Sequence, residues 1–257
     1  MTRERHRNTP PNPGHRPGCL ARWARRDLVL AVVTTLVVWL GNDALRLVES
    51  DTPSVSIGTP QDGRLAHGKR LPSSGANFRT YSRLGSFLGR TAVHDAVRDA
   101  TLAAYETLAA TRPETVYVYG ETGWPRGGRF RPHRTHRSGV SVDYMTPVTN
   151  REGRSVPLPT WPWLRFGYDM AFEPDGCTSG GSLCIDYPAL AAHLRALHAV
   201  GHEHGVRIGR VIFAPDLQAG LFAADSDLRD LMAFSRNPSW VRHDDHIHVD
   251  FVLREDG

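Results

Sequence analysis

The sequence predicts an α+β fold, in which a small antiparallel sheet is flanked by helices and long loops and preceded by an N-terminal apolar helix. Three observations support this prediction. Apolar residues repeat at helical spacing over 91–110 and 187–204, and side chains alternate as in strands over 115–120 and 247–253. These helices and strands do not alternate regularly along the chain, which disfavours a parallel α/β sheet.

The N-terminus has the pattern of an export signal. Residues 1–27 form a basic, Pro-rich tail, and the apolar run Leu28–Leu40 is interrupted only by Thr34 and Thr35. No clean small-x-small cleavage site follows, so an uncleaved signal anchor over 28–48 is favoured over a cleaved signal peptide. A buried helix of the domain is the third alternative. An anchor would keep the tail in the cytoplasm and place the rest in the periplasm or another extracytoplasmic space.

The charge distribution disfavours nucleic-acid binding. The tail holds seven arginines against Glu4 and Asp27, a net charge of +5. Because the whole chain carries +4, the remainder carries about −1. The folded part therefore lacks the basic surface that nucleic acid requires, and no nucleic-acid partner is expected.

Two of the three cysteines lie close together in the sequence. Cys177 and Cys184 are separated by a short Gly/Ser-rich stretch, and in an oxidising compartment we expect them to form a disulfide. Free thiols and a metal-binding pair are the alternatives. No further Cys follows the tail to complete a metal site.

The remaining elements are expected in this order. Residues 49–75 are rich in turn residues and are interpreted as a linker and irregular entry to a domain over 76–257. A helix over 91–110 ends before Pro113, and strands are expected at 115–120 and 140–145 on either side of a Gly-rich loop. A long, functional connection is expected over 146–186, followed by a helix over 187–204 and a strand over 210–213. A short helix over 226–235, capped by Ser226, and a strand over 247–253 complete the list.

Two histidine clusters suggest a metal site. The first is His133-Arg-Thr-His136-Arg-Ser-Gly-Val-Ser-Val-Asp143, and the second is His243-Asp-Asp-His246-Ile-His248. In a strand, His246 and His248 share one face because the side-chain period is two. Gly139 allows a turn, so that His136 in a loop and Asp143 on a strand can converge. Two imidazoles and a carboxylate that leave a fourth position open are typical of a catalytic zinc site.

The chain resembles the penicillin-insensitive murein endopeptidases, zinc metallopeptidases related to the lysostaphin-type, D-Ala-D-Ala and hedgehog-like peptidases. The resemblance rests on both histidine clusters and, in the same order, on Ser56-Ile-Gly-Thr-Pro60, Gly123-Trp-Pro-Arg-Gly-Gly-Arg-Phe130 and Val211-Ile-Phe-Ala-Pro215. It covers about residues 55–253 and implies that the sheet carries a Zn²⁺ ion bound by His136, Asp143 and His248.

The same resemblance implies roles for the other histidines. It places His246 beside the zinc-bound water rather than among the ligands, His243 at another functional histidine position and His133 at an accessory position of the motif. His246 can accept a proton, and a protonated His243 can stabilise an oxyanion, although exchanging the two roles fits the sequence equally well. Asp245 lies at the offset of a catalytic glutamate in related dipeptidases. A strand would turn it away from His246, so a solvent-facing or His-orienting carboxylate is the favoured interpretation.

Other candidates are weaker. Arg126 and Arg129 could pair with substrate carboxylates, and Trp161, Trp163 and Phe166 could line a groove. His198 and His202 have helical metal-binding spacing but lack the order of a zinc-peptidase helix motif.

Taken with the export signal, these observations predict a zinc-dependent endopeptidase that hydrolyses the D-Ala to diamino-acid cross-links of peptidoglycan. Its partners would be peptidoglycan stem peptides and, through the apolar segment, the membrane. A wall carboxypeptidase, an L,D-endopeptidase and an inactive zinc-stabilised wall-binding module are the alternatives.

Overall fold

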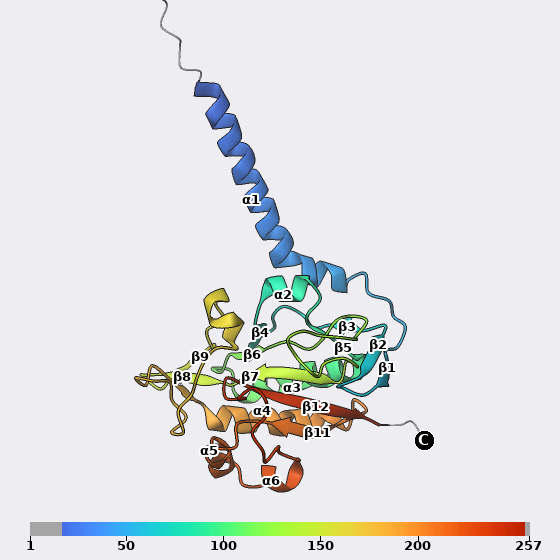
Figure 1. Ribbon diagram of the computed structural model, residues 1–257, viewed down its shortest axis with the longest axis vertical. Helices are drawn as coiled ribbons and strands as arrows, with labels where there is room; N and C mark the ends of the chain where they lie inside the picture. The colour runs from blue at the N-terminus through green and yellow to red at the C-terminus, as the bar shows by residue number, and fades with distance from the viewer. Residues whose placement is uncertain (1–16, 255–257) are drawn as a thin grey trace, which may run out of the picture. The chain divides into compact units, whose positions relative to one another are not determined.

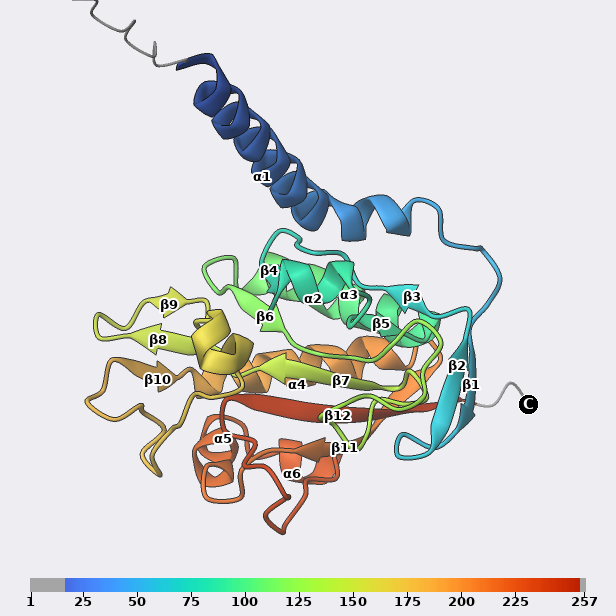
Figure 2. The same cartoon turned by 45° about the horizontal axis from the view of Figure 1, so that its top comes forward.

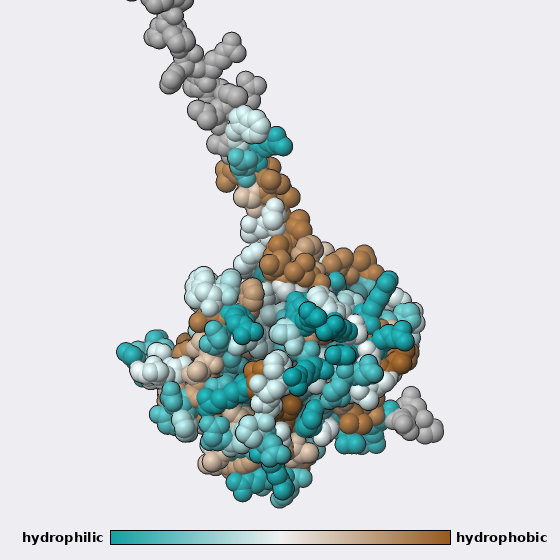
Figure 3. Space-filling view, viewed as in Figure 1, coloured by the Kyte–Doolittle hydropathy of each residue, from teal (hydrophilic) through white to brown (hydrophobic). Residues whose placement is uncertain are grey.

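The computed structural model describes residues 17–254, so residues 1–16 of the predicted tail lie outside the described part. The chain divides into two compact units, 1–37 and 38–257. The long helix α1, Pro17–Arg46, starts in the first unit and ends in the second. Its segment Arg25–Arg46 is long and apolar enough to cross a membrane, a test that a signal sequence near the N-terminus also passes. Hydrophobic side chains follow α1 in Figure 3.

The second unit is built on a five-stranded sheet in the order β11-β12-β7-β6-β4 (Figure 1). These strands are Val206–Ile212, His246–Leu253, Ser141–Met145, Tyr117–Tyr119 and Phe78–Thr80. All neighbours are antiparallel except β4 and β6, which are parallel. A parallel pair needs a long crossover, and α3 lies within the connection between these two strands. The predicted α+β class is confirmed, with a mixed rather than purely antiparallel main sheet.

One face of this sheet is covered by α3, Asp95–Thr111, and α4, Tyr187–Gly201 (Figures 1 and 2). The buried side chains of α3 include Val97, Ala100, Ala104 and Leu108, which follow the spacing seen in the sequence. Helix α3 begins four residues later than predicted, because Ala92–Val93 form the short strand β5 paired with β3, Lys69–Arg70. The imidazole of His94 caps α3 by accepting a hydrogen bond from the Ala96 amide.

The predicted long connection over 146–186 contains a second, three-stranded sheet. It is formed by β8, β9 and β10, which are Val148–Asn150, Ser155–Val156 and Leu183–Ile185, and Figure 2 shows it beside one end of β7. Cys177 and Cys184 form the expected disulfide. The helical turn η1, Pro162–Gly167, follows β9.

The remaining elements differ more from the sequence prediction. Residues 49–75 form no separate linker, because the hairpin β1–β2, Val55–Gly58 and Gly63–Ala66, and the buried Leu65 and Leu71 belong to the second unit. Helix α2 spans Arg83–Phe87. Helix α5, Gln218–Ala224, was not predicted. The helix expected over 226–235 is only α6, Leu228–Leu231, and Asp227 rather than Ser226 precedes it as N-cap, without a side-chain hydrogen bond.

Candidate metal centre

The candidate site lies on the sheet face opposite α3 and α4. Successive side chains of a strand point to opposite faces. In β7, Tyr144 points to the helices, since its hydroxyl group shares a 2.8 Å hydrogen bond with that of Thr101 in α3. Asp143 therefore points to the other face, and the antiparallel register places it directly beside His248 of β12. Adjacent strands thus bring together two residues that are 105 positions apart in the sequence.

Four histidines lie within 3.9 Å of the Asp143 carboxylate, and the fourth, His246, is described below. Nε2 of His136 lies 3.2 Å from Oδ1, and Nδ1 of His248 lies 2.9 Å from the same oxygen. Nδ1 of His133 faces the other oxygen, Oδ2, at 3.7 Å. The potential ligand atoms of His133, His136 and Asp143 all lie within 4.8 Å of one another, so this cluster can hold a metal ion.

The outer ring nitrogens of these histidines are held by fixed acceptors. Nδ1 of His136 donates to the Thr122 carbonyl at 3.2 Å, and Nε2 of His248 donates to Asp250 Oδ1 at 2.8 Å. Each contact fixes a tautomer and aims the second nitrogen at Asp143. Nε2 of His136 is fully buried and has no hydrogen-bond partner among the described residues. A buried polar atom without a partner is costly, and a bound cation would satisfy it.

The loop that carries His136 depends on glycine. Its residue Gly139 has φ +78°, and His136 itself adopts the left-handed conformation with φ 65°. The backbone at Gly123 passes so close that a β-carbon there would lie 2.6 Å from the His136 carbonyl oxygen. Glycine at these two positions therefore allows the loop to bring the His136 ring onto the sheet.

The electrostatics of the cluster are those of a cation site. Burial opposes ionisation of Asp143, but the neighbouring His136 and His246 rings and the hydrogen bond with His248 hold the pKa of its carboxyl well below the ordinary value. Burial alone would lower the pKa of His248, but hydrogen bonds to Asp143 and Asp250 outweigh burial and raise that pKa to about 9. With this pKa, Nδ1 of His248 donates its hydrogen to Asp143, and a cation bound at Nδ1 would have to replace that proton.

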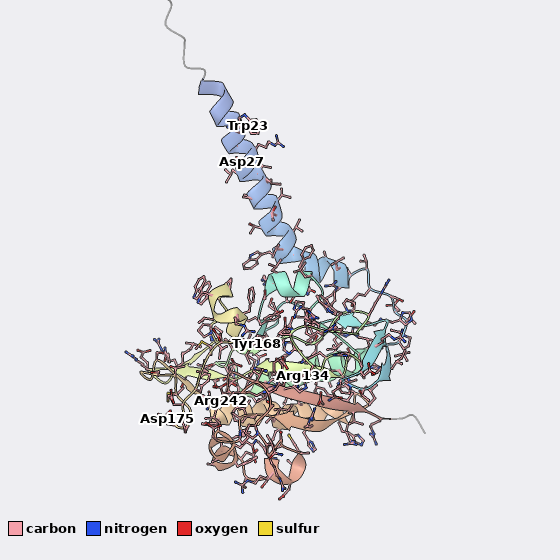
Figure 4. All side chains as sticks on the ribbon, viewed as in Figure 1. Trp23, Asp27, Arg134, Tyr168, Asp175 and Arg242 are labelled. Atoms are coloured by element: carbon pink, nitrogen blue, oxygen red, sulfur yellow. A yellow bond between two sulfur atoms is a disulfide. The ribbon has the colours of Figure 1, made fainter. Side chains whose placement is uncertain are left out.

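A cavity of about 730 Å³ lies over the cluster. His133, His246 and His248 line it, together with residues of η1 and of the loop around 239–243. Figure 4 labels Arg134 and Tyr168, two further lining residues, over the central strands. A ligand in this cavity would contact His133, His246 and His248, whereas His136 and Asp143 lie behind them and do not line it.

The second histidine cluster contributes two more rings. Nδ1 of His246 lies 2.5 Å from Asp245 Oδ1, while Nε2 lies 3.9 Å from Asp143 Oδ2. Asp245 precedes β12, is buried and holds the His246 ring, as in the favoured orienting interpretation. Nδ1 of His243 donates to the Val241 carbonyl at 2.8 Å. Burial and the neighbouring His246 lower the pKa of His243 to about 3, which disfavours the protonated oxyanion role considered above.

Some predicted substrate contacts are not at the cavity. Arg126 and Arg129 are exposed and do not line it, because their Gly-rich loop directs them elsewhere. Trp161 and Trp163 are exposed and stack on each other with ring centroids 5.3 Å apart, and only Phe166 of the three aromatic candidates lines the cavity.

Several residues of the site were missed in the sequence. Glu121 lies two residues after β6, hydrogen-bonds Nε2 of His133 at 2.6 Å and pairs with Arg90. These partners outweigh burial and lower the pKa of Glu121 to about 2. The Tyr168 hydroxyl donates to Asp143 Oδ2 at 3.0 Å and accepts from the Glu121 amide at 2.7 Å. Only Asp250 carried a signal, since it alternates with His246 and His248 along one strand.

Comparisons of the chain with models of known protein families and with curated protein sequences gave no match.

Proposed function

We propose that this protein is a zinc-dependent peptidase that hydrolyses the D-Ala to diamino-acid cross-links of bacterial peptidoglycan. One observation carries the proposal: His136 Nε2 and His248 Nδ1 converge on the same oxygen of Asp143, at 3.2 and 2.9 Å, beneath a cavity large enough for a peptide. The ordered motifs that resemble murein endopeptidases supply the substrate class.

The donor set favours zinc. Two imidazoles and one carboxylate are common zinc ligands, and in a tetrahedral site with bonds of about 2.1 Å the ligand atoms lie roughly 3.4 Å apart. The separations of 3.2 and 2.9 Å from Asp143 Oδ1 are close to this value. When bound, zinc supplies Lewis acidity that polarises a carbonyl group and acidifies water.

The third ligand is proposed to be His248 rather than His133. His248 approaches the oxygen that also faces His136, whereas His133 faces the second carboxylate oxygen. His248 is also buried, while His133 is partly exposed at the cavity. His133 is therefore assigned to the wall of the site, where Glu121 orients it.

His246 is proposed as the proton acceptor. Asp245 accepts the hydrogen of its Nδ1, which leaves Nε2 unprotonated, with its lone pair available within the site. His243 is neutral and also exposes an unprotonated Nε2, since its Nδ1 donates to Val241. Tyr168 holds the second oxygen of Asp143 and so keeps the carboxylate oriented.

The location supports a substrate outside the cytoplasm. An apolar helix near the N-terminus can act as a signal or anchor, and the disulfide Cys177–Cys184 suggests an oxidising compartment. The proposed enzyme would act on stem peptides from the outer face of the membrane.

Digestion of purified cross-linked muropeptides tests this function. The full-length protein in detergent should convert dimers into monomers when zinc is present, and chelation or His248→Ala should abolish the conversion. Mass spectrometry of the products would identify the bond. Stoichiometric zinc binding without any cleavage would instead favour a wall-binding module, and release of terminal D-Ala alone would favour a carboxypeptidase.

A further inference from the structure

The cavity over the metal cluster carries an excess of positive charge. Among the described residues that line it are four arginines and one carboxylate, Glu121; the arginines are Arg90, Arg134, Arg165 and Arg210. Two of these arginines are neutralised within the protein. Arg90 pairs with Glu121, and Arg210 pairs with Asp250 at 2.6 Å.

Arg134 and Arg165 have no such partner. Within residues 17–254, no carboxylate forms an ion pair with either guanidinium group, and both side chains are exposed to the cavity. Their donors are therefore available to a ligand. Since an arginine presents two parallel N–H groups that match a carboxylate, the pair forms an anion-binding surface.

The position of Arg134 is fixed by an aromatic contact. Its guanidinium lies over the ring of Trp240, 5.0 Å from the centroid, and both residues line the cavity. Stacking on the ring face leaves the N–H groups at the edge of the guanidinium plane free. The contact also links the His136 loop to the loop before β12 across the site.

Arg165 lies in an unusual backbone conformation. Arg165 and Phe166 have φ values of 47° and 59°, two consecutive non-glycine residues in the left-handed region. This conformation is unfavourable for residues with a β-carbon and persists where the surroundings impose it, commonly at functional sites. Here the Phe166 amide donates to the Trp161 carbonyl at 3.1 Å, and its ring packs edge-on against Tyr81. Both side chains thereby line the cavity.

We infer that Arg134 and Arg165 bind carboxylates of the substrate, so that the cavity selects peptides with free carboxylates beside the scissile bond. This inference rests on the proposed peptidase function and specifies its substrate. The diamino acid of a cross-linked stem carries such a carboxylate when it is not amidated. A peptide whose diamino acid is a carboxamide offers no anion to either arginine and should be a poor substrate.

The test compares two cross-linked muropeptides that differ only in this group, carboxylate or carboxamide. The full-length zinc-loaded protein should prefer the carboxylate form. The double variant Arg134→Gln/Arg165→Gln should raise KM for that form by about 10-fold or more, with kcat nearly unchanged, and should hardly affect the amidated form. The matched control is Arg126→Gln/Arg129→Gln, which removes the same charge outside the cavity and should behave as wild type.

Binding is measured in parallel, so that the inference does not depend on turnover. Calorimetric titration of the metal-free protein with each peptide should show the same preference, and the double variant should lose it while its melting temperature matches that of the control. The inference would be overturned if the wild type bound and cleaved the two peptides equally well. It would also be overturned if the double variant lost affinity for both peptides to the same extent. Preferential binding of the carboxylate form without cleavage would support it while contradicting the proposed function, and absence of binding would overturn both.

Discussion

Asp250 holds the ring of His248, the proposed third ligand, without lying in the candidate metal cluster itself. Its Oδ1 accepts hydrogen bonds from Nε2 of His248 at 2.8 Å and from the Ser141 hydroxyl at 2.6 Å, while Oδ2 pairs with Arg210. The carboxylate is therefore fixed on both sides, and it fixes the ring in turn. Such outer partners commonly affect metal affinity nearly as much as the ligands do.

Asp250→Asn should weaken zinc binding by about 10–100-fold, because the amide group no longer holds the His248 tautomer as strongly. Competition with a chromophoric chelator measures the affinity. Asp230→Asn, an exposed carboxylate of α6, is the control and should bind zinc as wild type. An affinity within about twofold of wild type in Asp250→Asn would show that this carboxylate does not support a ligand.

His193 is a second residue whose surroundings predict a measurable effect, in this case on the pH dependence of stability. It is buried between Tyr105, Tyr117 and Tyr144, and neither ring nitrogen has a hydrogen-bond partner among the described residues. Burial lowers its pKa to about 3. The folded state therefore keeps it neutral, whereas the unfolded chain binds a proton below a pKa of about 6.5. The contribution of His193 to stability is lost as the pH falls from about 6.5 towards 3.

His193→Leu should remove this acid sensitivity. When the pH is lowered from 7.5 to 5, the free energy of unfolding of wild type should fall by about 2 kcal/mol more than that of the variant, since each pH unit corresponds to about 1.4 kcal/mol. Urea unfolding of the fragment 38–257 at both pH values measures the difference. A difference that does not change with pH would mean that His193 is protonated or hydrogen-bonded in the fold.

Residue types and spacing identified most of the candidate site, but not the substrate-facing arginines. A strand period and a glycine turn indicated that His136 and Asp143 could lie close to His246 and His248, and the resemblance to the murein endopeptidases implied which of them would be ligands. Arg126 and Arg129 were selected for proximity in sequence, and the direction of a loop side chain does not follow from proximity. The cavity arginines Arg134 and Arg165 depend on tertiary contacts that no local pattern reports.

At the level of elements, long periodic segments were predictable and short ones were not. Strand β12 and helices α3 and α4 follow from alternation and helical spacing, which reflect burial of one face. The short helices α5 and α6 and the strands β8–β10 bury few residues of their own, and tertiary packing decides them. The start of α3 was misplaced because Ala92–Val93 pair with β3, a contact between distant segments.

The C-terminal end of α1 is part of the folded unit. Asn42 is fully buried, and its amide group donates to the Leu71 carbonyl at 2.9 Å and to Ser73 Oγ at 3.2 Å. Asp43 accepts a hydrogen bond from the Ser73 amide at 3.0 Å. A helix predicted from hydropathy alone gives no reason to expect these polar contacts at its end.

A fragment that starts at Glu49 should therefore be less stable than one that starts at Val38. The shorter fragment lacks at least the three hydrogen bonds named above, and at about 1 kcal/mol each their loss predicts a free energy of unfolding at least about 3 kcal/mol lower. Urea denaturation of both fragments measures it, and Asn42→Ala in the longer fragment should account for part of the loss. Equal midpoints for the two fragments would contradict the contribution of these residues.

In the second unit, the two faces of the central sheet have different roles: one packs into the hydrophobic core and the other carries the candidate site. Helices α3 and α4 cover one face of the central sheet, and the opposite face carries Asp143, His246, His248 and Asp250, of which His246 and His248 line the cavity. The sheet thus provides a rigid base for ligands that come from distant parts of the sequence. Loops supply the remaining groups of the candidate site, so a change in substrate preference would arise from changes in these loops.

The most direct test of this account is zinc binding by the full-length protein and its His248→Ala and His133→Ala variants, measured by calorimetry and metal analysis. The wild type should bind one zinc ion per chain, His248→Ala should lose it, and His133→Ala should retain it with an affinity within about 10-fold of wild type. A wild type that binds no zinc, or a His248→Ala variant that still binds it while His133→Ala does not, would contradict the proposed metal centre.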